Sequence, residues 1–372
     1  MRKIRVLIVD DSTVIRRLLS DILAEDPEIE VAGTAANGKI ALSKLSNINP
    51  DVVTLDMEMP EMDGLATLTE LRKTYPNLPV IMFSTLTSRG AASTLDALSL
   101  GANDYVTKPA NVGSVMAAMQ IVRQELVPKI KGLCNWYRKA SASTDRNSRT
   151  AIRVANLAAN QPKKKVQAEI IAIGVSTGGP NALAILLPSL PKDLPVPIVI
   201  VQHMPPIFTK HLADRLNQSC SIEIAEAKAG DMLRPGTAWI APGNFHMTVK
   251  RSGTAVYIET NQDPPENSCR PAVDTLFRSV SATYGSSALA CVLTGMGQDG
   301  MRGCNTIRDA GGFVIAQDEE SSVVWGMPRA VVHAGLADSV KPLDQIAYEL
   351  ESRCSRKNTF PFVQRSTQIA SS

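Results

Sequence analysis

The sequence lacks the features that define several large classes of protein. Its six cysteines are scattered, with no C-x-x-C pair and no histidine at metal-ligand spacing, which argues against a disulfide framework and a zinc site. No apolar run approaches the ~18 residues that a membrane span requires. The first apolar run, in MRKIRVLIVDDS, is too short for a signal peptide and is followed by aspartates. We therefore expect a cytoplasmic protein with reduced thiols and no membrane insertion.

An excess of charge of one sign is also missing. The chain has 39 basic and 36 acidic residues, for a formal net charge of +3, so we expect no binding to nucleic acid. Aromatic residues make up only 4% of the chain, but apolar residues reach 44%, which is typical of a globular protein. A length of 372 residues favours two or three domains, each with its own core.

Short β-branched runs alternate with amphipathic segments in the first third of the chain. The runs are IRVLIV, IEVAGTA, DVVTLD, PVIMFST and NDYVTK. Strands that alternate with helices form parallel sheets covered on both faces. Residues 1–125 are therefore predicted to form an α/β domain with a parallel five-stranded sheet.

A polar linker and a second α/β domain are predicted to follow. Residues 126–167 form the predicted linker, because from about Ala140 the chain is rich in serine, lysine and asparagine. The α/β rhythm resumes over residues 168–352, with AEIIAIGVS, PVPIVIVQHM, GTAWIAPG, ALACVLTGM and GGFVIAQD, which predicts a doubly wound, mainly parallel sheet. TVKRSGTAVYI predicts an added β-hairpin, and residues 353–372 are expected to be a disordered tail.

Three carboxylates follow predicted strands in the first domain. Asp10 and Asp11 come directly after IRVLIV, and Asp56 ends DVVTLD. The carboxyl ends of parallel strands meet at one edge of the sheet, where the three negative charges would repel one another. A hard divalent cation relieves this repulsion, and Mg²⁺ suits a site that also awaits phosphate oxygens. The pattern predicts that this acidic cluster is a magnesium site.

The same sheet edge is predicted to carry groups that hold a phosphoryl group. Ser84 and Thr85 end PVIMFST, and Lys108 ends NDYVTK, which adds hydroxyls and an ammonium group. Together, VDDS, LDMEMPEMDG, FST and DYVTKP resemble the receiver domain of bacterial response regulators.

The resemblance to receivers implies a flavodoxin-like fold for residues 1–125 and a role for each of these residues. Asp56 would accept a phosphoryl group from a histidine kinase, while the acidic cluster holds Mg²⁺. Lys108 would contact the phosphoryl group, Ser84 would be the switch hydroxyl, and Tyr105 would be the rotating aromatic side chain.

A serine lies at a predicted strand-to-helix turn in the second domain. IIAIGVSTGGPNALAILL indicates a strand, a glycine-rich turn and a helix, and GVSTG has the G-x-S-x-G spacing. The turn would project Ser176 at a helix N-terminus, where backbone N–H groups favour an oxyanion. The same glycines could instead hold a nucleotide phosphate, so the partners of Ser176 must decide between the two.

A serine nucleophile needs a general base, and four histidines are available. His203 ends the strand in VIVQHMPP, at the same sheet edge as Ser176, and is the preferred candidate. His211 and His246 are expected to be surface or packing residues. His333, in AVVHAGL, is a candidate for a satisfied buried histidine.

The third member of the site should be a carboxylate that orients the histidine. Asp299 follows ALACVL in a glycine-rich loop and is the best candidate. Asp274 is its rival, but a position after Arg270-Pro271 at a helix start favours a capping role. The chain order Ser, His, Asp differs from the order in α/β-hydrolases, so the G-x-S-x-G spacing does not assign that fold.

Six segments of the second domain together resemble one family. IGVSTGG, QHMPP, IAPGNFHM, RPAVDTLF, LTGMGQDG and VVWGMPR are similar to the catalytic domain of the chemotaxis protein-glutamate methylesterases, the CheB family. The resemblance implies hydrolysis of glutamate γ-methyl esters on methyl-accepting chemoreceptors, and deamidation of certain receptor glutamines. No cofactor is implied for the esterase reaction.

The same resemblance assigns roles at the second site. Ser176 would be the nucleophile, His203 the general base and acid, and Asp299 the carboxylate that orients it. Thr177 and the backbone N–H of Met296 would stabilise the oxyanion.

The presence of both sites in one chain suggests how activity is controlled. The unphosphorylated receiver would cover the opening near Ser176, and phosphorylation of Asp56 by a chemotaxis histidine kinase would uncover it. Two other functions stay open. A nucleotide-binding output module would use the glycines of residues 174–179 for a phosphate. A DNA-binding regulator would need a helix-turn-helix, which the alternating second half does not indicate.

Overall fold

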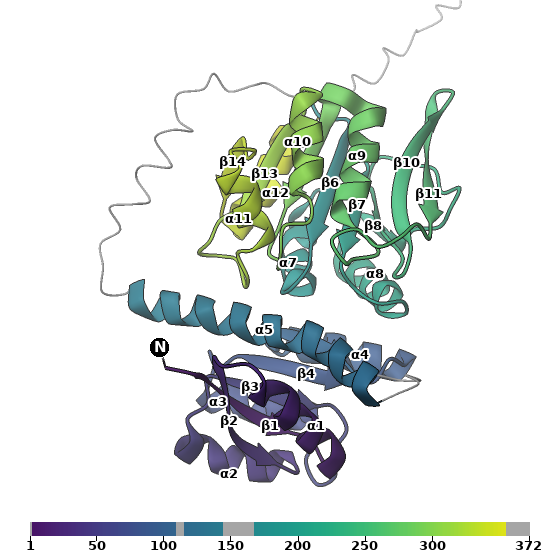
Figure 1. Ribbon diagram of the computed structural model, residues 1–372. Helices are drawn as coiled ribbons and strands as arrows, with labels where there is room; N and C mark the ends of the chain where they lie inside the picture. The colour runs from purple at the N-terminus through teal and green to yellow at the C-terminus, as the bar shows by residue number, and fades with distance from the viewer. Residues whose placement is uncertain (1, 109–114, 144–166, 355–372) are drawn as a thin grey trace, which may run out of the picture.

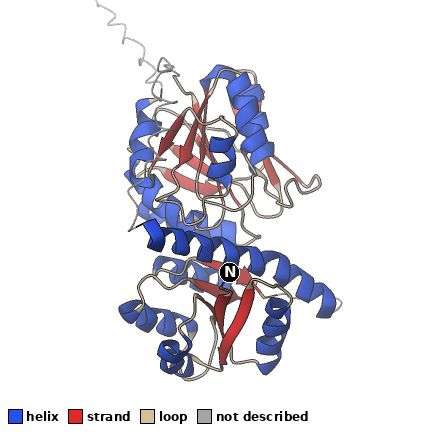
Figure 2. Cartoon of the chain, turned by 60° about the vertical axis from the view of Figure 1, so that its left-hand side comes forward, coloured by secondary structure: helices blue, strands red, loops and turns tan. Residues whose placement is uncertain are grey.

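The computed structural model describes residues 2–108, 115–143 and 167–354. Two α/β halves are stacked, and the amino-terminal half lies below the carboxyl-terminal half in Figure 1. Each half has a central sheet with helices on its faces, and a long helix lies along the boundary between them (Figure 2).

The amino-terminal half contains the five-stranded sheet predicted from the sequence. Its strand order is β2-β1-β3-β4-β5, and every pair is parallel. The strands are β1 (Ile4–Val9), β2 (Ile29–Ala35), β3 (Val52–Asp56), β4 (Val80–Ser84) and β5 (Asp104–Thr107). The helices are α1 (Thr13–Ala24), α2 (Gly38–Ile48), α3 (Gly64–Thr74), α4 (Ser88–Ser99) and α5 (Val115–Ser143). The predicted fold of this half is confirmed.

Polar side chains start the first four helices of this half. At each start a side-chain oxygen accepts a hydrogen bond from the N–H three residues further on; the residues are Ser12, Asn37, Asp63 and Thr87. Each bond satisfies an N–H group that has no partner within its helix.

The carboxyl-terminal half contains a seven-stranded sheet. Its order is β14-β13-β12-β6-β7-β9-β8, again with every pair parallel. The strands are β6 (Ile170–Val175), β7 (Ile198–Gln202), β8 (Glu223–Glu226), β9 (Thr237–Ile240), β12 (Ala288–Val292), β13 (Phe313–Gln317) and β14 (Ser339–Lys341). The helices are α7 (Gly179–Leu186), α8 (Phe208–Ser219), α9 (Val273–Tyr284), α10 (Met301–Asp309), α11 (Met327–His333) and α12 (Leu343–Ser352), with single 3₁₀ turns at Leu187–Ser189 and Gly285–Ser287. The predicted doubly wound fold is confirmed.

The two outermost strands of this sheet were not predicted. β8 has the sequence EIAE and β14 has the sequence SVK. Short, charged strands are common at sheet edges, where they discourage pairing with other chains. Such segments lack the apolar run that reveals a central strand.

The predicted hairpin is present beside the large sheet. β10 (His246–Ser252) and β11 (Ala255–Asn261) form a separate antiparallel pair, with Ser252 opposite Ala255. The hairpin is tied to α9, because Val249 N donates to Ser279 Oγ over 3.1 Å.

The last helix of the first half is longer than the sequence analysis expected. α5 continues past residue 125, the predicted end of the first domain, to Ser143. Its buried apolar side chains recur at helical spacing and share a core cluster with Val324 of the second half; they are Val122, Leu126, Ile130 and Leu133. Part of the predicted linker is therefore a helix packed between the halves. The rest of the linker and the predicted tail beyond Cys354 lie outside the described residues.

The two halves meet through α4 and β5 on one side and α7 and α8 on the other. The rings of Tyr105 and Phe208 are stacked, with centroids 4.9 Å apart. Beside this apolar contact, Arg215 Nη1 lies 2.6 Å from Asp96 Oδ1. The interface thus has an aromatic centre and a charged edge.

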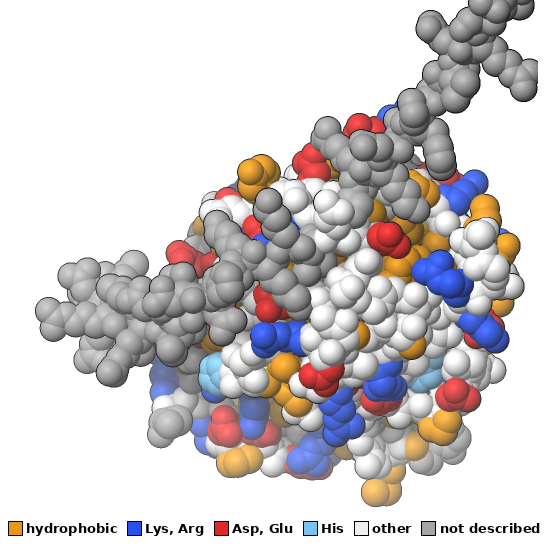
Figure 3. All heavy atoms as spheres, turned by 90° about the horizontal axis from the view of Figure 1, so that it is seen from above, with side chains coloured by type: hydrophobic (Ala, Val, Ile, Leu, Met, Phe, Trp, Pro, Cys, Tyr) orange, Lys and Arg blue, Asp and Glu red, His pale blue; other side chains and the backbone are white. Residues whose placement is uncertain are grey.

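The face of the carboxyl-terminal half that points away from the first half carries both signs of charge. Figure 3 shows basic and acidic side chains interspersed over the part of that face drawn in colour. Within the described ranges, no helix combines the length and apolarity needed to cross a bilayer.

Candidate functional site

The acidic cluster predicted in the first half is brought together by the sheet. Asp10 and Asp11 follow β1 and Asp56 ends β3, and one oxygen from each lies within 4.8 Å of the other two. β1 and β3 are neighbours at the point where the strand order reverses, which is where open α/β sheets bind ligands. Asp10 and Asp56 are each 1% exposed, whereas Asp11 is exposed.

Charge at this cluster is incompletely compensated. Lys108 Nζ lies 2.7 Å from Asp56 Oδ1 and 3.5 Å from Asp10 Oδ2. Burial raises the pKa of Asp56 to about 6; the Asp10 carboxylate adds to the rise and Lys108 opposes it. Asp56 Oδ2 is buried without a hydrogen-bond partner among the described residues. The oxygen donors and the unpartnered carboxylate atom fit a hard divalent cation such as Mg²⁺.

The other residues predicted for this site divide into two groups. A cavity of about 560 Å³ beside Asp56 is lined by Thr85, Lys108 and Arg89, the last of which the sequence analysis did not single out. Ser84 is fully buried, and its hydroxyl faces α4, where it accepts from Thr94 Oγ1 over 2.7 Å. The structure therefore does not bring the Ser84 hydroxyl to Asp56.

Tyr105 lies at the boundary between the halves. Its side chain is 7% exposed and stacks on Phe208 of α8. Burial raises the pKa of the phenol well above its ordinary value, so the side chain is neutral. Tyr105 thus links the strand next to Ser84 with a helix of the second half.

Ser176 follows β6 directly, in the turn that leads into α7. Its N–H donates to Thr294 O over 3.0 Å. Its own carbonyl accepts from Gly179 N and from Gln202 Nε2. The turn needs a glycine, because Gly178 has a φ of 75° and a side chain there would be strained. Ser176 therefore lies beside the N-terminus of α7, as predicted from the sequence.

The glycines of this turn admit closely packed valines. A methyl group added at Gly174 would lie 2.3 Å from Val273 Cγ1, and one at Gly178 would lie 2.6 Å from Val323 Cβ. Close packing thus explains these two glycines without a bound phosphate, which weakens the nucleotide-binding alternative.

His203 and Asp299 form a short contact next to Ser176. His203 follows β7 as Ser176 follows β6, and the residues before them, Val175 and Gln202, are paired across the two strands. His203 Nε2 lies 2.8 Å from Asp299 Oδ2. In the described part of the chain, Ser176 Oγ makes no hydrogen bond with His203. The sheet brings the three residues to one edge, but this arrangement leaves Ser176 and His203 unbonded to each other.

The ionisation of Asp299 determines which nitrogen of His203 can act as a base. Burial alone would raise the pKa of Asp299, but bonds from His203 and from the N–H groups of Val273 and Asp274 lower it. An ionised carboxylate can only accept, so Nε2 of His203 carries the proton of the neutral ring. Burial tends to lower the pKa of His203, yet bonding to Asp299 and Cys269 raises it to about 10, which favours the imidazolium form of the resting ring. When the ring is neutral, Nδ1 is the nitrogen without a proton and so the one that can accept a proton from a serine.

Sequence analysis missed Cys269, which faces that nitrogen. Cys269 Sγ lies 3.6 Å from His203 Nδ1, and the cysteine is half-buried. It comes from the segment PPENSCRP, whose polar pattern does not indicate where it packs. The thiol therefore occupies the direction from which a serine proton would come.

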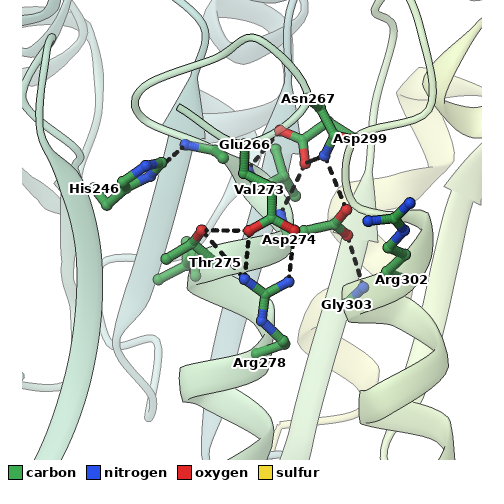
Figure 4. Close-up of polar contacts among 12 residues, drawn as sticks. His246, Glu266, Asn267, Val273, Asp274, Thr275, Arg278, Asp299, Arg302 and Gly303 are labelled. Carbon is green, nitrogen blue, oxygen red and sulfur yellow. Dashed lines mark hydrogen bonds and ion pairs between the residues drawn. The ribbon is translucent and has the colours of Figure 1, made fainter. Parts of the chain in front are cut away.

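Asp299 and Asp274 cap each other's helices, as Figure 4 shows in part. Asp299, just before α10, accepts from Val273 N and Asp274 N at the start of α9. Asp274, in α9, accepts from Gly303 N at the start of α10 over 2.7 Å. Asn267 Nδ2 donates to both carboxylates. The sequence analysis favoured capping for Asp274, and the structure gives a capping contact to Asp299 as well.

Two backbone N–H groups beside Ser176 are available to a ligand. Within the described residues, neither Thr177 N nor Met296 N donates to a protein acceptor. α5 passes close to this region, since a methyl group at Gly132 would lie 3.8 Å from Met296 Sδ. The first half thus reaches the rim of the site.

The remaining histidines lie apart from this site. His211 Nε2 lies 2.8 Å from Ser88 Oγ across the boundary between the halves. His246 is buried and accepts from Ala272 N over 3.2 Å. His333, the candidate for a buried histidine, is not buried: it ends α11 and is exposed, edge-on to Trp325.

Comparison with known proteins confirms both family resemblances. Residues 6–120 match the response regulator receiver domain family, and residues 171–350 match the CheB methylesterase family. A protein-glutamate methylesterase/protein-glutamine glutaminase of Trichodesmium erythraeum is 54% identical, over 95% of this chain and 99% of its own length. A protein of the same name from a Nocardioides species is 49% identical, over 96% of this chain and 97% of its own length. The chain therefore belongs to the protein-glutamate methylesterase/protein-glutamine glutaminase family of hydrolases, with a receiver domain ahead of its CheB methylesterase domain.

Proposed function

We propose that this enzyme hydrolyses glutamate γ-methyl esters on methyl-accepting chemoreceptors, deamidates certain receptor glutamines, and is switched on by phosphorylation of Asp56. The observation that carries the proposal is the 2.8 Å contact of His203 with Asp299 at the sheet edge that also bears Ser176. Methylesterase and glutaminase activities are named for relatives that match nearly the whole chain.

The proposed reaction uses Ser176 as nucleophile and Nδ1 of His203 as base. The Ser176 hydroxyl attacks the ester carbonyl carbon while His203 takes its proton. The C–O bond to the methoxy group then breaks, and methanol leaves with the proton returned by His203. Water activated by the same nitrogen cleaves the acyl-serine bond and releases the glutamate carboxylate. With a glutamine side chain, the leaving group is ammonia.

Asp299 and two backbone N–H groups would support the charges that develop. Asp299 stabilises the imidazolium form of His203 and fixes which nitrogen is free. The N–H groups of Thr177 and Met296 would bind the oxyanion, and removing one such donor typically costs about 10²- to 10³-fold in turnover.

Control would come from the receiver domain. A chemotaxis histidine kinase would donate the phosphoryl group to Asp56, with Lys108 contacting it. Mg²⁺ held by the acidic cluster would offset the charge of the phosphoryl oxygens. Phosphorylation would then weaken the contact at Tyr105 and Phe208, and α5 would withdraw from the rim near Met296.

The test is methanol release from methyl-labelled chemoreceptor membranes, with and without a small-molecule phosphodonor. Wild-type protein should release methanol faster with the phosphodonor, whereas Ser176→Ala should release none above background. Asp56→Asn should show the basal rate under both conditions. Ser189→Ala changes an exposed serine in the turn after α7 and should behave as wild type. Release that persists in Ser176→Ala would exclude this serine as the nucleophile.

A further inference from the structure

Gln202 is a buried polar residue between the two proposed catalytic side chains. It ends β7, is 2% exposed, and pairs with Val175 of β6. Its side-chain Nε2 donates to the carbonyl of Ser176 over 3.0 Å and to the carbonyl of His203 over 3.3 Å. One carboxamide thus holds the backbones of the nucleophile and of the base.

The sheet ladder shows which donors these two carbonyls would otherwise bind. On the β7 side, His203 N donates to Val175 O. In a continued parallel ladder the next bond would run from Thr177 N to His203 O. The chain instead enters Pro205-Pro206, which cannot extend a strand ladder. The His203 carbonyl would be left without a donor if Gln202 did not supply one.

The same reasoning applies on the other side of β6. Ser176 N donates to Thr294 O. A continued parallel ladder would return a bond from Met296 N to Ser176 O. Ser176 O instead accepts from Gly179 N within the turn and from Gln202 Nε2. The Gln202 amide thus occupies acceptor positions on Ser176 O and His203 O that the Met296 and Thr177 N–H groups would otherwise take.

We propose that Gln202 is a positioning residue for the hydrolase reaction: it ends the sheet ladder so that the N–H groups of Thr177 and Met296 stay free for the oxyanion. This inference rests on the proposed function of Ser176. A purely packing role does not account for an amide here, because Gln202 Oε1 is buried without a hydrogen-bond partner among the described residues. Leaving such an atom unsatisfied is unfavourable, and an apolar side chain of similar length would avoid that penalty.

The first test is Gln202→Met, which keeps the length of the side chain and removes its donors. We expect kcat to fall by about 10- to 100-fold, because an oxyanion donor is lost or misplaced. KM should change little, since Gln202 is buried. Labelling of Ser176 by a phosphonate ester, whose oxygen occupies the oxyanion position, should slow by the same factor. Ser281→Ala removes another buried hydrogen bond, to Thr306 O, and should label at the wild-type rate.

A second variant keeps the proposal testable if Gln202→Met does not fold. Gly179→Ala would place a methyl group 2.0 Å from Gln202 Oε1, and so displaces the amide without deleting it. It should reproduce the loss of kcat and of labelling. If folded Gln202→Met is labelled at the wild-type rate, the inference is overturned and the proposed function is left intact. If Gln202→Met does not fold, the same outcome with Gly179→Ala has the same meaning. A wild-type enzyme that neither labels nor releases methanol would overturn both.

Discussion

Replacing Asp299 by asparagine should damage both catalysis and folding, for separable reasons. The carboxylate is 2% exposed and accepts five hydrogen bonds, from His203 Nε2, Val273 N, Asp274 N, Gly300 N and Asn267 Nδ2. Three of them reach Oδ1, so the asparagine oxygen should take that place. The new NH₂ group then faces His203 and Val273 N.

The two consequences can be given magnitudes. His203 can accept from the NH₂ group only by moving its proton to Nδ1, the proposed base, and the same substitution in a serine protease lowers kcat by about 10⁴-fold. Val273 N loses its acceptor at the start of α9. Leaving one buried donor unsatisfied costs about 1–3 kcal/mol, and losing the negative charge at the helix start adds up to about 1 kcal/mol. The free energy of unfolding should fall by about 1–4 kcal/mol.

The assay pairs methanol release with urea unfolding for Asp299→Asn and for Asp274→Asn. Asp274 shares Asn267 and caps α10 but does not contact His203. Burial already raises the pKa of Asp274, so a neutral replacement should cost less stability there, and turnover should stay within a few-fold of wild type. Equal turnover losses in the two variants would refute the tautomer argument, and an unchanged unfolding midpoint in Asp299→Asn would refute the capping argument.

Two further predictions concern the receiver domain and the boundary between the halves. Burial raises the pKa of Asp56 from 3.8 to about 6, so the fold binds this proton more tightly than the unfolded chain and loses stability as the pH rises through that range. In thermal unfolding, Asp56→Asn should therefore be more stable than wild type at about pH 8 but not at about pH 4. Mg²⁺ should raise the wild-type unfolding temperature more at the higher pH. An equal effect of Mg²⁺ at the two pH values would count against a magnesium site. Arg215→Glu replaces the attraction to Asp96 by repulsion, worth about 0.2–1 kcal/mol for exposed charges. At low salt, Arg215→Glu should raise methanol release by the unphosphorylated enzyme a few-fold. Adding Asp96→Lys in the same chain should reverse the effect. An unchanged basal rate would show that this contact has no part in the control mechanism.

The parts that sequence reasoning located are those set by parallel strands. Asp56 and Ser176 end or follow an apolar run directly, His203 follows the last residue of β7, and parallel strands place such residues at one sheet edge. Cys269 and Asn267 could not be located in this way. They come from a polar loop after an antiparallel hairpin, and no periodicity tells which strand end the loop will reach.

The sequence did not show how far α5 extends, because its partners are remote in sequence. Leu126 and Ile130 have helical spacing, but they share a core cluster with Val324 of the other half. Gln202 was missed for a different reason: a glutamine at a strand end has no distinctive pattern, and its role depends on where the neighbouring strands stop. The Ser84 hydroxyl was expected beside Asp56, and its bond to Thr94 in α4 depends on a rotamer that sequence does not specify.

The mutual capping of α9 and α10 changes what a relative's sequence can reveal. A descendant that lost esterase activity would still need a carboxylate at the position of Asp299, since the start of α9 depends on it. Retention of that aspartate among homologues would therefore reflect selection for folding as well as for catalytic activity. Among the described residues, Ser176 Oγ makes no contact of this kind that stabilises the fold. Replacement of Ser176 in a relative would therefore be the better indicator of an inactive enzyme, retained for its receiver domain or for a binding surface.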